Sequence, residues 1–294
     1  MKIGVLYNCQ HQGLANGLQA LMPDANVISY ELSVLKSPEL QEQAATALGS
    51  CDTVVCAPID QKWGSLSNQA LGAEVQRICI IPPISFAGFH PDMIYVITSE
   101  GHLSGATGPY HSRIVIASYL EKLSVSQTTE LFNRFVFVNL GYLQAFEQAV
   151  EFLISRYKQY NVDLGSYIEC WRTKGCFMHS INHPKIHVLC DLAIIFCKMM
   201  GIGVEENLAN FEMVPDNLSN HPKHPVFPQI ASKLGISGSC LFKPANDLVG
   251  RGFKVLPLDA FIDQQFATYS KVPREHLIAA DGVQRAVDLL SAGK

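Results

Sequence analysis

The sequence lacks clustered charge of either sign. Only 16% of its 294 residues are charged, and 22 Lys and Arg stand against 26 Asp and Glu, which gives a net charge of −4. Nucleic-acid-binding proteins need clustered Lys and Arg for phosphate contacts, so we expect no nucleic acid partner. Hydrophobic residues make up 48% of the chain, which is typical of a folded globular protein with a substantial core.

A long uninterrupted hydrophobic run is also missing. The longest apolar region, residues 188–200, contains Asp191 and Lys198, so we expect no membrane span. The N-terminal segment MKIGVLYN is too short for the core of a signal peptide and suits a first strand. The nine cysteines are scattered and form no CxxC pair, which speaks against a zinc ribbon or a thioredoxin-like site. Reduced thiols in a cytoplasmic protein are the simplest interpretation.

Short β-rich runs alternate with helical segments over the first hundred residues. The runs are 2–7, 26–30, 52–57, 77–82 and 93–98. Strands separated by helices predict an α/β fold with a mostly parallel sheet and helices on its faces. Beyond Tyr110 the pattern becomes mainly helical, with a capping box at Ser124 and Gln127. We predict an α/β part over 1–115 and a mainly helical part over 116–294, either as two domains or within one compact fold.

A cysteine flanked by two amides follows the first predicted strand. Cys9, between Asn8 and Gln10, would lie past the carboxyl end of that strand, where ligands bind in open α/β folds. The N-terminus of the following helix would favour a thiolate and lower the pKa of Cys9. Backbone and side-chain amides there would also suit an oxyanion. The alternative is a packed turn with an incidental thiol.

The segment FHPDMIYVI places His90, Pro91 and Asp92 directly before another predicted strand. A histidine with a nearby aspartate suggests an oriented general base, and the proline fixes the turn between them. In the alternative interpretation, Asp92 caps the turn and His90 is a surface residue.

A glycine-rich loop, Gly101 to Gly108, precedes a helix that we expect to start near Tyr110. Such loops let backbone amides approach phosphates, although the spacing matches neither the dinucleotide fingerprint nor the P-loop. His111, Ser112 and Arg113 would occupy the first helical turn. Arg113 would then pair with a phosphate or simply solvate the helix surface.

Three histidines at intervals of four, His179, His183 and His187, raise the question of a metal site. Pro184 places His179 before the helix, so it does not share a face with His187, and no carboxylate partner accompanies them. We therefore expect no metal. In our interpretation Asn182 caps this helix and His183 points from its N-terminus into a cleft, whereas His221 and His224 are weaker candidates.

The ordered motifs YNCQ, FHPDMIYV, GPYHSRIV and NHP resemble the WcbI family of polysaccharide-biosynthesis proteins, over residues 1 to about 200. The resemblance implies a coenzyme A-dependent acetyltransferase of capsule-type polysaccharide biosynthesis, which holds coenzyme A in a cradle between an α/β part and helices. It carries over the N-C-Q, H-P-D, Y-H-S and N-H-P residues as site residues, and Tyr7 replaces the glycine that precedes N-C-Q in the family.

The implied reaction is acyl transfer from a coenzyme A thioester to a hydroxyl of a sugar or polysaccharide precursor. Its partners would be the acyl donor, a glycan acceptor and proteins of the same pathway. The expected site residues fall into three roles. Those expected to be catalytic are Cys9, His90, His111 and His183; those expected to bind the cofactor are Asn8, Gln10, Gly108, Tyr110, Ser112 and Arg113; those expected to orient substrate are Asp92, His179 and Asn182.

Two other functions stay open. An esterase or thioesterase would use the same site and send the acyl group to water, as in SGNH-type esterases, which have Ser where this chain has Cys9. No clear C-terminal D-x-x-H supports that interpretation. A non-catalytic module that binds coenzyme A or a glycan is the second alternative.

Overall fold

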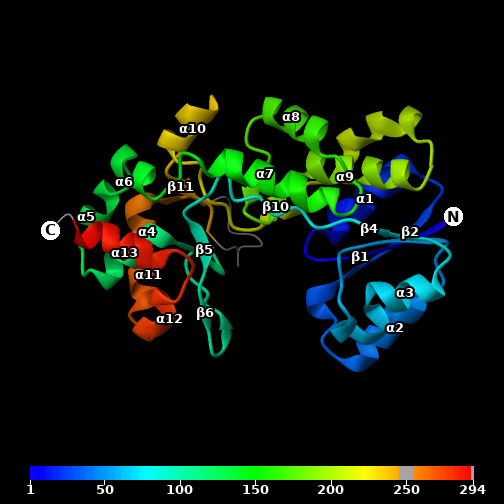
Figure 1. The fold of residues 1–294 in the computed structure, drawn as a ribbon, viewed down its shortest axis with the longest axis horizontal. Coiled ribbons are helices and arrows are strands. Elements are labelled where there is room, and N and C mark those ends of the chain that lie inside the picture. The colour runs from blue at the N-terminus through cyan, green and yellow to red at the C-terminus, as the bar shows by residue number, and fades with distance from the viewer. Residues whose placement is uncertain (245–253, 293–294) are drawn as a thin grey trace. The chain divides into compact units, whose positions relative to one another are not determined.

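The structure is a computed structural model that describes residues 1–244 and 254–292 (Figure 1). The chain forms two compact units, which are described separately. The first unit comprises residues 1–85, 151–177 and 182–219, and the second comprises 86–150, 178–181 and the described part of 220–294. Because the chain returns to the first unit within helix α7 (Ala145–Lys158), segments from both sides of residue 115 contribute to each unit.

A four-stranded parallel sheet forms the centre of the first unit. Its order is β2-β1-β3-β4, with bounds β1 Lys2–Tyr7, β2 Asn26–Glu31, β3 Thr53–Cys56 and β4 Ile78–Ile80. All but the first residue of β1 and all of β3 are buried, as expected for central strands covered on both faces. The predicted α/β class, with a parallel sheet and flanking helices, is confirmed.

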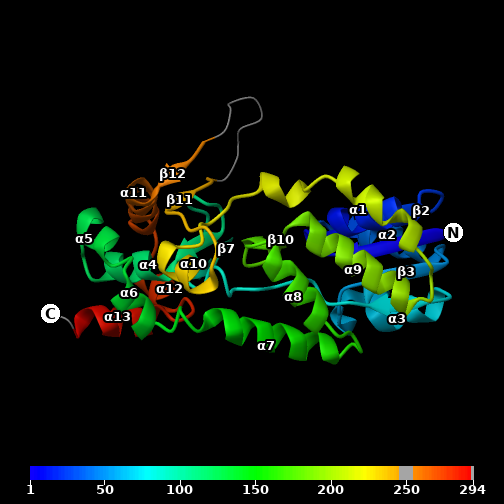
Figure 2. The same cartoon turned by 90° about the horizontal axis from the view of Figure 1, so that it is seen from above.

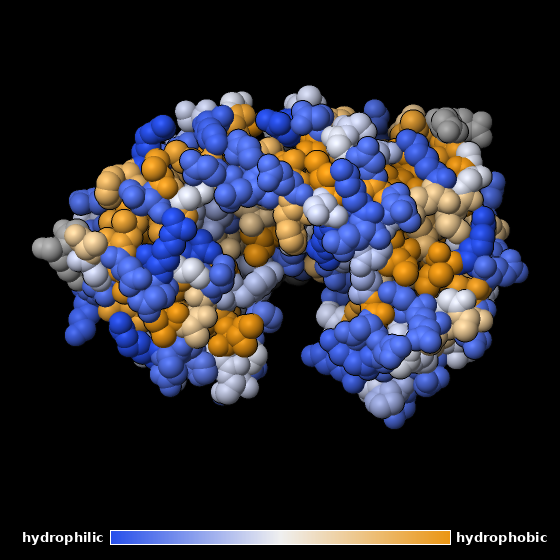
Figure 3. Space-filling view, in the orientation of Figure 1, coloured by the Kyte–Doolittle hydropathy of each residue, from blue (hydrophilic) through white to orange (hydrophobic). Residues whose placement is uncertain are grey.

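Helices cover both faces of this sheet. Figure 1 shows α1 (His11–Leu21) and α9 (Ile186–Met199) over one face, and α2 (Pro38–Gly49) and α3 (Asn68–Glu74) over the other. The surface of α2 and α3 seen in Figure 3 is mainly hydrophilic. Other helical segments of this unit are η1 (Leu32–Val34), η2 (Gln61–Leu66), α8 (Gly165–Thr173) and η3 (Glu205–Met213), and η4 (Asn217–Asn220) begins at its end.

The second unit is mainly helical. Its strand pairs are antiparallel and short: β5 (Met93–Tyr95) with β8 (Tyr110–Ser112), β6 (Ile97–Thr98) with β7 (Gly101–His102), and β11 (Leu241–Phe242) with β12 (Leu256–Pro257). The other strands are β9 (Met178–Ser180) and, in the first unit, β10 (His183–Pro184). The helices are α4 Arg113–Leu120, α5 Val125–Glu130, α6 Arg134–Asn139, α10 Pro228–Leu234, α11 Leu258–Tyr269, α12 Arg274–Ile278 and α13 Val283–Ser291.

The predicted strand 93–98 does not join the parallel sheet. It divides into β5 and β6, and both parts form antiparallel pairs in the second unit. A parallel fifth strand needs a crossover of about a dozen residues or more, usually helical. No helix separates residues 82 and 93, where the sequence contains prolines and a turn. The β-rich composition of residues 93–98 therefore identified a strand but not its partner.

Two predicted helix starts are wrong. Residues 110–112 form strand β8, so His111 lies in a strand, Ser112 is the N-cap of α4, and only Arg113 belongs to the first helical turn. Likewise, His183 and Pro184 form β10, and α9 begins at Ile186 after Lys185. Ser112 caps its helix by accepting a hydrogen bond from the Val115 amide. The N-cap of α9 is Lys185 and not the predicted Asn182.

The predicted capping box of α5 is confirmed, with both hydrogen bonds between Ser124 and Gln127 present. Ser37 caps α2, and Pro38 occupies the first position of that helix. Within the part of the chain that the structure describes, no helix has the length and apolar character needed to cross a membrane.

Candidate functional site

The order of the parallel sheet marks one position at its edge. Strand β1 lies between β2 and β3. The connection that follows β1 leads to its neighbour on one side, and the connection that follows β2 leads to its neighbour on the other side. The two connections therefore diverge beyond the carboxyl end of β1. In open α/β sheets, ligands bind at such a divergence. Asn8, Cys9 and Gln10 form the turn at this point, between β1 and α1.

Cys9 is partly exposed in this turn, as its position in the sequence predicted. Its electrostatics differ from the prediction, because burial raises the pKa of the Cys9 thiol to about 11. The Glu31 carboxylate raises it further, and a backbone hydrogen bond to the sulfur opposes both effects. The predicted lowering by the helix N-terminus is therefore wrong: desolvation and a nearby negative charge outweigh the helix dipole. Cys9 rests as a thiol.

Asn8 shapes the turn through its oxygen atoms. Its side-chain Oδ1 accepts a hydrogen bond from the Gln10 amide at 3.0 Å, and its carbonyl accepts one from the His11 amide at 2.9 Å. The Asn8 Nδ2 group, on a partly exposed side chain, donates to no described residue. This amide is a donor close to Cys9 that the fold leaves available.

Gln10 is fully buried and braces the site instead of facing a ligand. Its Nε2 donates to the carbonyls of Ile84 at 2.7 Å and Asn182 at 2.9 Å, and its Oε1 accepts from the Ile84 amide at 3.1 Å. Both amide hydrogens are thus in use. Gln10 joins the Asn-Cys-Gln turn to the Asn-His-Pro segment, which lies far away in the sequence.

Helices α1 and α9 run parallel from this point, side by side (Figure 2). A Cβ on Gly13 would lie 2.4 Å from Leu189 Cδ1, and a Cβ on Gly17 would lie 3.3 Å from the Ala193 Cβ. The helices therefore pack closely in the same direction, with both N-termini at the Cys9 edge. The partial positive charges of two helix N-termini favour an anion or a developing oxyanion there. Asn182 and the buried His183 precede α9 at this edge.

Sequence reasoning missed three polar residues beside Cys9. Glu31 ends β2 and pairs in register with Tyr7 of β1, two residues before Cys9. His11 begins α1, with its Nδ1 at 3.1 Å from Ser29 Oγ and its Nε2 at 3.8 Å from Glu31 Oε2. The carboxyl ends of neighbouring parallel strands meet at one edge, so Glu31 was detectable once 26–30 was recognised as a strand.

Tyr7, the residue before the Asn-Cys-Gln turn, lies in the interior of the first unit. It is fully buried, and its hydroxyl donates to the Ile81 carbonyl at 2.6 Å. The side chain therefore links the end of β1 to the segment after β4.

In the second unit, Asp92 does not orient His90 as a general base, contrary to the prediction. His90 Nε2 donates to the His224 carbonyl at 3.1 Å, and burial lowers the pKa of His90 to about 4. Asp92 Oδ1 instead accepts from the Ile114 amide at 3.0 Å and from the Tyr142 hydroxyl at 2.8 Å. Asp92 thereby fixes the start of α4, and burial raises its pKa. The surface alternative for His90 is also wrong, because both side chains are buried.

His111 is likewise buried, with both ring nitrogens occupied. Nε2 donates to the Leu103 carbonyl at 3.0 Å, so Nδ1 accepts from the Tyr269 hydroxyl at 3.1 Å. Burial lowers the pKa of His111. Tyr110, beside it, is buried and accepts from the Ser180 hydroxyl at 3.2 Å. These side chains form part of the polar interior of the unit.

The glycine-rich loop closes on itself. The amides of Gly105 and Gly108 donate to each other's carbonyls, at 2.8 and 3.0 Å, and the loop leads into β8 instead of a helix. The predicted phosphate cradle at a helix N-terminus is therefore not formed by these amides. Gly105 is required for packing, because a Cβ there would lie 2.3 Å from Gln265 Oε1.

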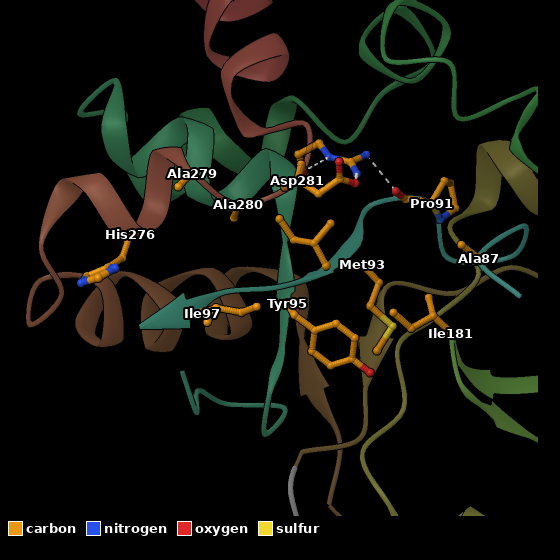
Figure 4. A pocket seen from close by; sticks show the side chains of 12 residues that line it. Ala87, Pro91, Met93, Tyr95, Ile97, Ile181, His276, Ala279, Ala280 and Asp281 are labelled. Carbon is orange, nitrogen blue, oxygen red and sulfur yellow. Dashed lines mark hydrogen bonds and ion pairs between the residues drawn. The ribbon is translucent and has the colours of Figure 1, made fainter. Parts of the chain in front are cut away.

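Arg113 lines a pocket of about 460 Å³ in the second unit. Its guanidinium donates to the Pro91 carbonyl at 3.0 Å, to the Asp281 carbonyl at 2.9 Å and to Asp281 Oδ2 at 3.0 Å. Figure 4 shows the apolar side chains Met93, Ile97 and Ile181 around this space, with Asp281 and His276 at separate positions on its wall. The Asp281 side chain is 89% exposed, so it is the replaceable partner of Arg113.

The predicted site residues fall into two groups. Those of the first unit are Asn8, Cys9, Gln10, Asn182 and His183, and the Gln10 side chain joins the Cys9 turn to Asn182. Those of the second unit are His90, Asp92, Gly108, Tyr110, His111, Ser112, Arg113 and His179. His179 is buried near His90 and lowers its pKa. Among the described residues, no three His, Cys, Asp or Glu side chains are arranged to hold a metal ion.

Comparison with known proteins agrees with the motifs. A solved structure of WcbI, described as a novel polysaccharide biosynthesis enzyme in a native form without a disulfide bond between coenzyme A and one of its cysteines, shares the fold. Its TM-score is 0.76 over 98% of each chain, at 12% sequence identity. No curated protein sequence matches the chain significantly. The model of the polysaccharide biosynthesis enzyme WcbI matches residues 2–205, more than half of the chain. The resemblance is thus confirmed, and the chain belongs to the WcbI family of polysaccharide biosynthesis enzymes.

Proposed function

We propose that this protein transfers an acyl group, acetyl in the simplest case, from a coenzyme A thioester to a hydroxyl of a sugar or polysaccharide precursor. The observation that carries the proposal is the partly exposed Cys9 thiol at the divergence point of the sheet, beside the N-termini of α1 and α9. Membership of a polysaccharide biosynthesis family supports it. The similar WcbI structure supports it further, because that protein is described with reference to a disulfide bond between coenzyme A and a cysteine, absent in the native form.

Two routes fit a thiol at this position. In the covalent route, the Cys9 sulfur attacks the thioester carbonyl, the bond to the coenzyme A sulfur breaks, and coenzyme A leaves with the proton lost by Cys9. The acceptor hydroxyl then attacks the Cys9 thioester and returns a proton to the sulfur. In the direct route, the acceptor hydroxyl attacks the donor thioester while Cys9 lines the site. Both routes need a base. In the covalent route, about one Cys9 in ten thousand is ionised at pH 7 when the thiol pKa is about 11. In the direct route, the acceptor hydroxyl must lose its proton as it attacks.

Both routes also pass through a tetrahedral oxyanion. The donors near Cys9 are the Asn8 Nδ2 group and the backbone amides of the turn, in the field of two helix N-termini. One such donor contributes about a hundred- to a thousandfold to the rate. Gln10 keeps these donors in place through its three side-chain hydrogen bonds.

In the second unit, we assign Arg113 as the candidate contact for a phosphate of coenzyme A. It lies at the wall of a mainly apolar pocket, and its acidic partner Asp281 is exposed. A phosphate would take the place of the Asp281 carboxylate on the guanidinium.

The test is an assay of acetyl-coenzyme A with a panel of sugar acceptors that quantifies acetylated sugar and free acetate separately. We expect sugar acetylation that Cys9→Ala reduces at least a hundredfold, while Cys170→Ala, an exposed thiol of α8, leaves it unchanged. Intact mass without acceptor distinguishes the routes, since only the covalent route leaves an acetyl group on Cys9. Free acetate alone would identify a hydrolase, and coenzyme A binding without turnover would identify a binding module.

A further inference from the structure

The imidazole of His11 is held beside the Cys9 turn by two polar residues of β2. Ser29 and Glu31 stand two positions apart on the strand, so their side chains share one face. Ser29 Oγ is 3.1 Å from His11 Nδ1, and Glu31 Oε2 is 3.8 Å from His11 Nε2. The Ser33 hydroxyl in turn donates to Glu31 Oε1. Glu31 is therefore anchored on the side away from the imidazole.

This arrangement suits a ring that gains and loses a proton. When the Nδ1 hydrogen is donated to Ser29 Oγ, the lone pair of the neutral ring lies at Nε2. The distance of 3.8 Å from Nε2 to Glu31 is too long for a hydrogen bond but short enough for an ion pair. Protonation at Nε2 therefore creates an imidazolium next to a carboxylate, which stabilises the charged ring.

The charges around Cys9 also favour a neutral His11 that can accept a proton. Burial lowers the pKa of His11, which keeps the ring neutral and able to accept a proton at pH 7, while Glu31 raises it. Glu31 also raises the pKa of Cys9. Among the described residues, Glu31 is the only charged side chain that shifts the pKa of either group. The His11 and Glu31 side chains are 20% and 28% exposed, so both can be reached from solvent.

We propose that His11 is the general base of the Cys9 site and that Glu31 and Ser29 are its positioning residues. The inference rests on the proposed acyl transfer and names the residue that accepts its proton. In the covalent route, the proton of the Cys9 thiol moves to His11 Nε2, the sulfur attacks the acyl carbon, and the departing coenzyme A sulfur takes that proton from the imidazolium. The ring then accepts the proton of the attacking hydroxyl and returns it to the Cys9 sulfur. In the direct route, the acceptor hydroxyl gives its proton to His11, which passes it to coenzyme A.

The deciding experiment uses the opposite effects that Glu31→Gln should have on two reactions of one site. Removal of the carboxylate lowers the pKa of Cys9, so alkylation of Cys9 by iodoacetamide at pH 8 should become about threefold faster. Removal of the same carboxylate leaves the His11 imidazolium unpaired, so acetyl transfer should become about tenfold slower. The acidic limb of the pH–rate profile should also move to lower pH. A merely structural role would not change these rates in opposite directions.

The controls lie in the same chain. Peptide mass spectrometry separates Cys9 from Cys170, whose alkylation rate should stay constant in every variant. Glu42→Gln, on the exposed face of α2, should change neither reaction. His11→Gln should slow transfer by about a hundredfold, the low end of what a general base contributes, and Glu31→Asp should restore part of the loss seen in Glu31→Gln.

The outcomes separate this inference from the proposed function. Acetyl transfer by the His11→Gln variant at the wild-type rate would overturn the assignment of the base and leave the proposed function intact. Absence of transfer in the wild-type protein would overturn the proposed function. In that case, the alkylation rate of Cys9 and the titration of His11 by NMR still test whether Glu31 interacts with both groups. An unchanged alkylation rate and an unchanged His11 pKa in Glu31→Gln would disprove the interaction.

Discussion

The side-chain amide of Gln10 donates to the carbonyl of Asn182 at 2.9 Å and joins two segments that are 172 positions apart in the sequence. This bond ties the turn that carries Cys9 to the chain that enters α9. With the two bonds between Gln10 and Ile84, it makes one buried side chain the junction of three segments. The position of the Cys9 thiol at the sheet edge therefore depends on a residue that does not face the substrate.

Gln10→Leu should reduce the free energy of unfolding by about 2–4 kcal/mol, because it leaves buried groups of Ile84 and Asn182 without partners. Urea unfolding measures the loss. Gln12→Leu is the control, since the side chain of Gln12 is exposed and bonds only Asn16, and it should change stability by less than about 0.5 kcal/mol. Equal stability of the two variants would show that the buried hydrogen bonds do not hold the turn.

Tyr7 should be required for stability rather than for the reaction. Tyr7→Phe removes the hydrogen bond to the Ile81 carbonyl and should cost about 1 kcal/mol of unfolding free energy. Tyr7→Gly empties a fully buried position and should cost about 4 kcal/mol or more. Thermal and urea unfolding test both variants. A Tyr7→Gly protein as stable as the wild type would contradict the packing seen here.

Arg113 and Asp281 should have opposite effects on coenzyme A binding. Arg113→Ala removes the candidate phosphate contact and should weaken binding at least tenfold, about 1.4 kcal/mol. Asp281→Asn removes the competing carboxylate and should tighten it. Isothermal titration calorimetry with coenzyme A measures both, with Arg172→Ala as a control from an exposed ion pair. Unchanged affinity in Arg113→Ala would place the phosphates elsewhere.

The buried histidines of the second unit should make the protein sensitive to acid. The pKa of His90 is about 4 in the folded protein and about 6.5 in the unfolded chain. Between these values the unfolded state binds the extra proton, so the free energy of unfolding falls as the pH drops from 6.5 to 4. His90 alone accounts for about 3 kcal/mol of this loss. Burial lowers the pKa of His224 and His111 as well, whereas the raised pKa of Asp92 acts in the opposite direction.

Urea unfolding at pH 7, 5.5 and 4.5 measures this dependence. His90→Asn removes one of the titrating groups, so its stability should fall less steeply with acid than that of the wild type, whatever its stability at pH 7. Identical slopes for the two proteins would mean that His90 keeps an ordinary pKa in the folded state.

Features set by neighbours along the chain were predictable. The β-rich run 2–7 identified β1, and Ser124 with Gln127 identified the capping box of α5. The position of Cys9 after β1 followed in the same way. In each case the deciding contacts lie within a few residues.

The sequence alone could not assign roles to the polar residues. His90 and His111 carry the side chains of a general base, yet both are buried in the second unit with their protons committed to the carbonyls of His224 and Leu103. The amide of Gln10 is spent on Ile84 and Asn182. Burial and hydrogen-bond partners from distant parts of the sequence decide whether such a side chain can take part in catalysis or only stabilises the fold.

The sequence by itself determined the parallel α/β architecture, the strand-to-helix turn around Cys9 and the family, because periodicity, capping and short motifs are local properties of the chain. Only the tertiary structure decided that Glu31 and His11 accompany Cys9 and that the Cys9 thiol stays protonated. A pKa depends on desolvation and on charges brought close in space, and in this protein the decisive charge arrives from the neighbouring strand.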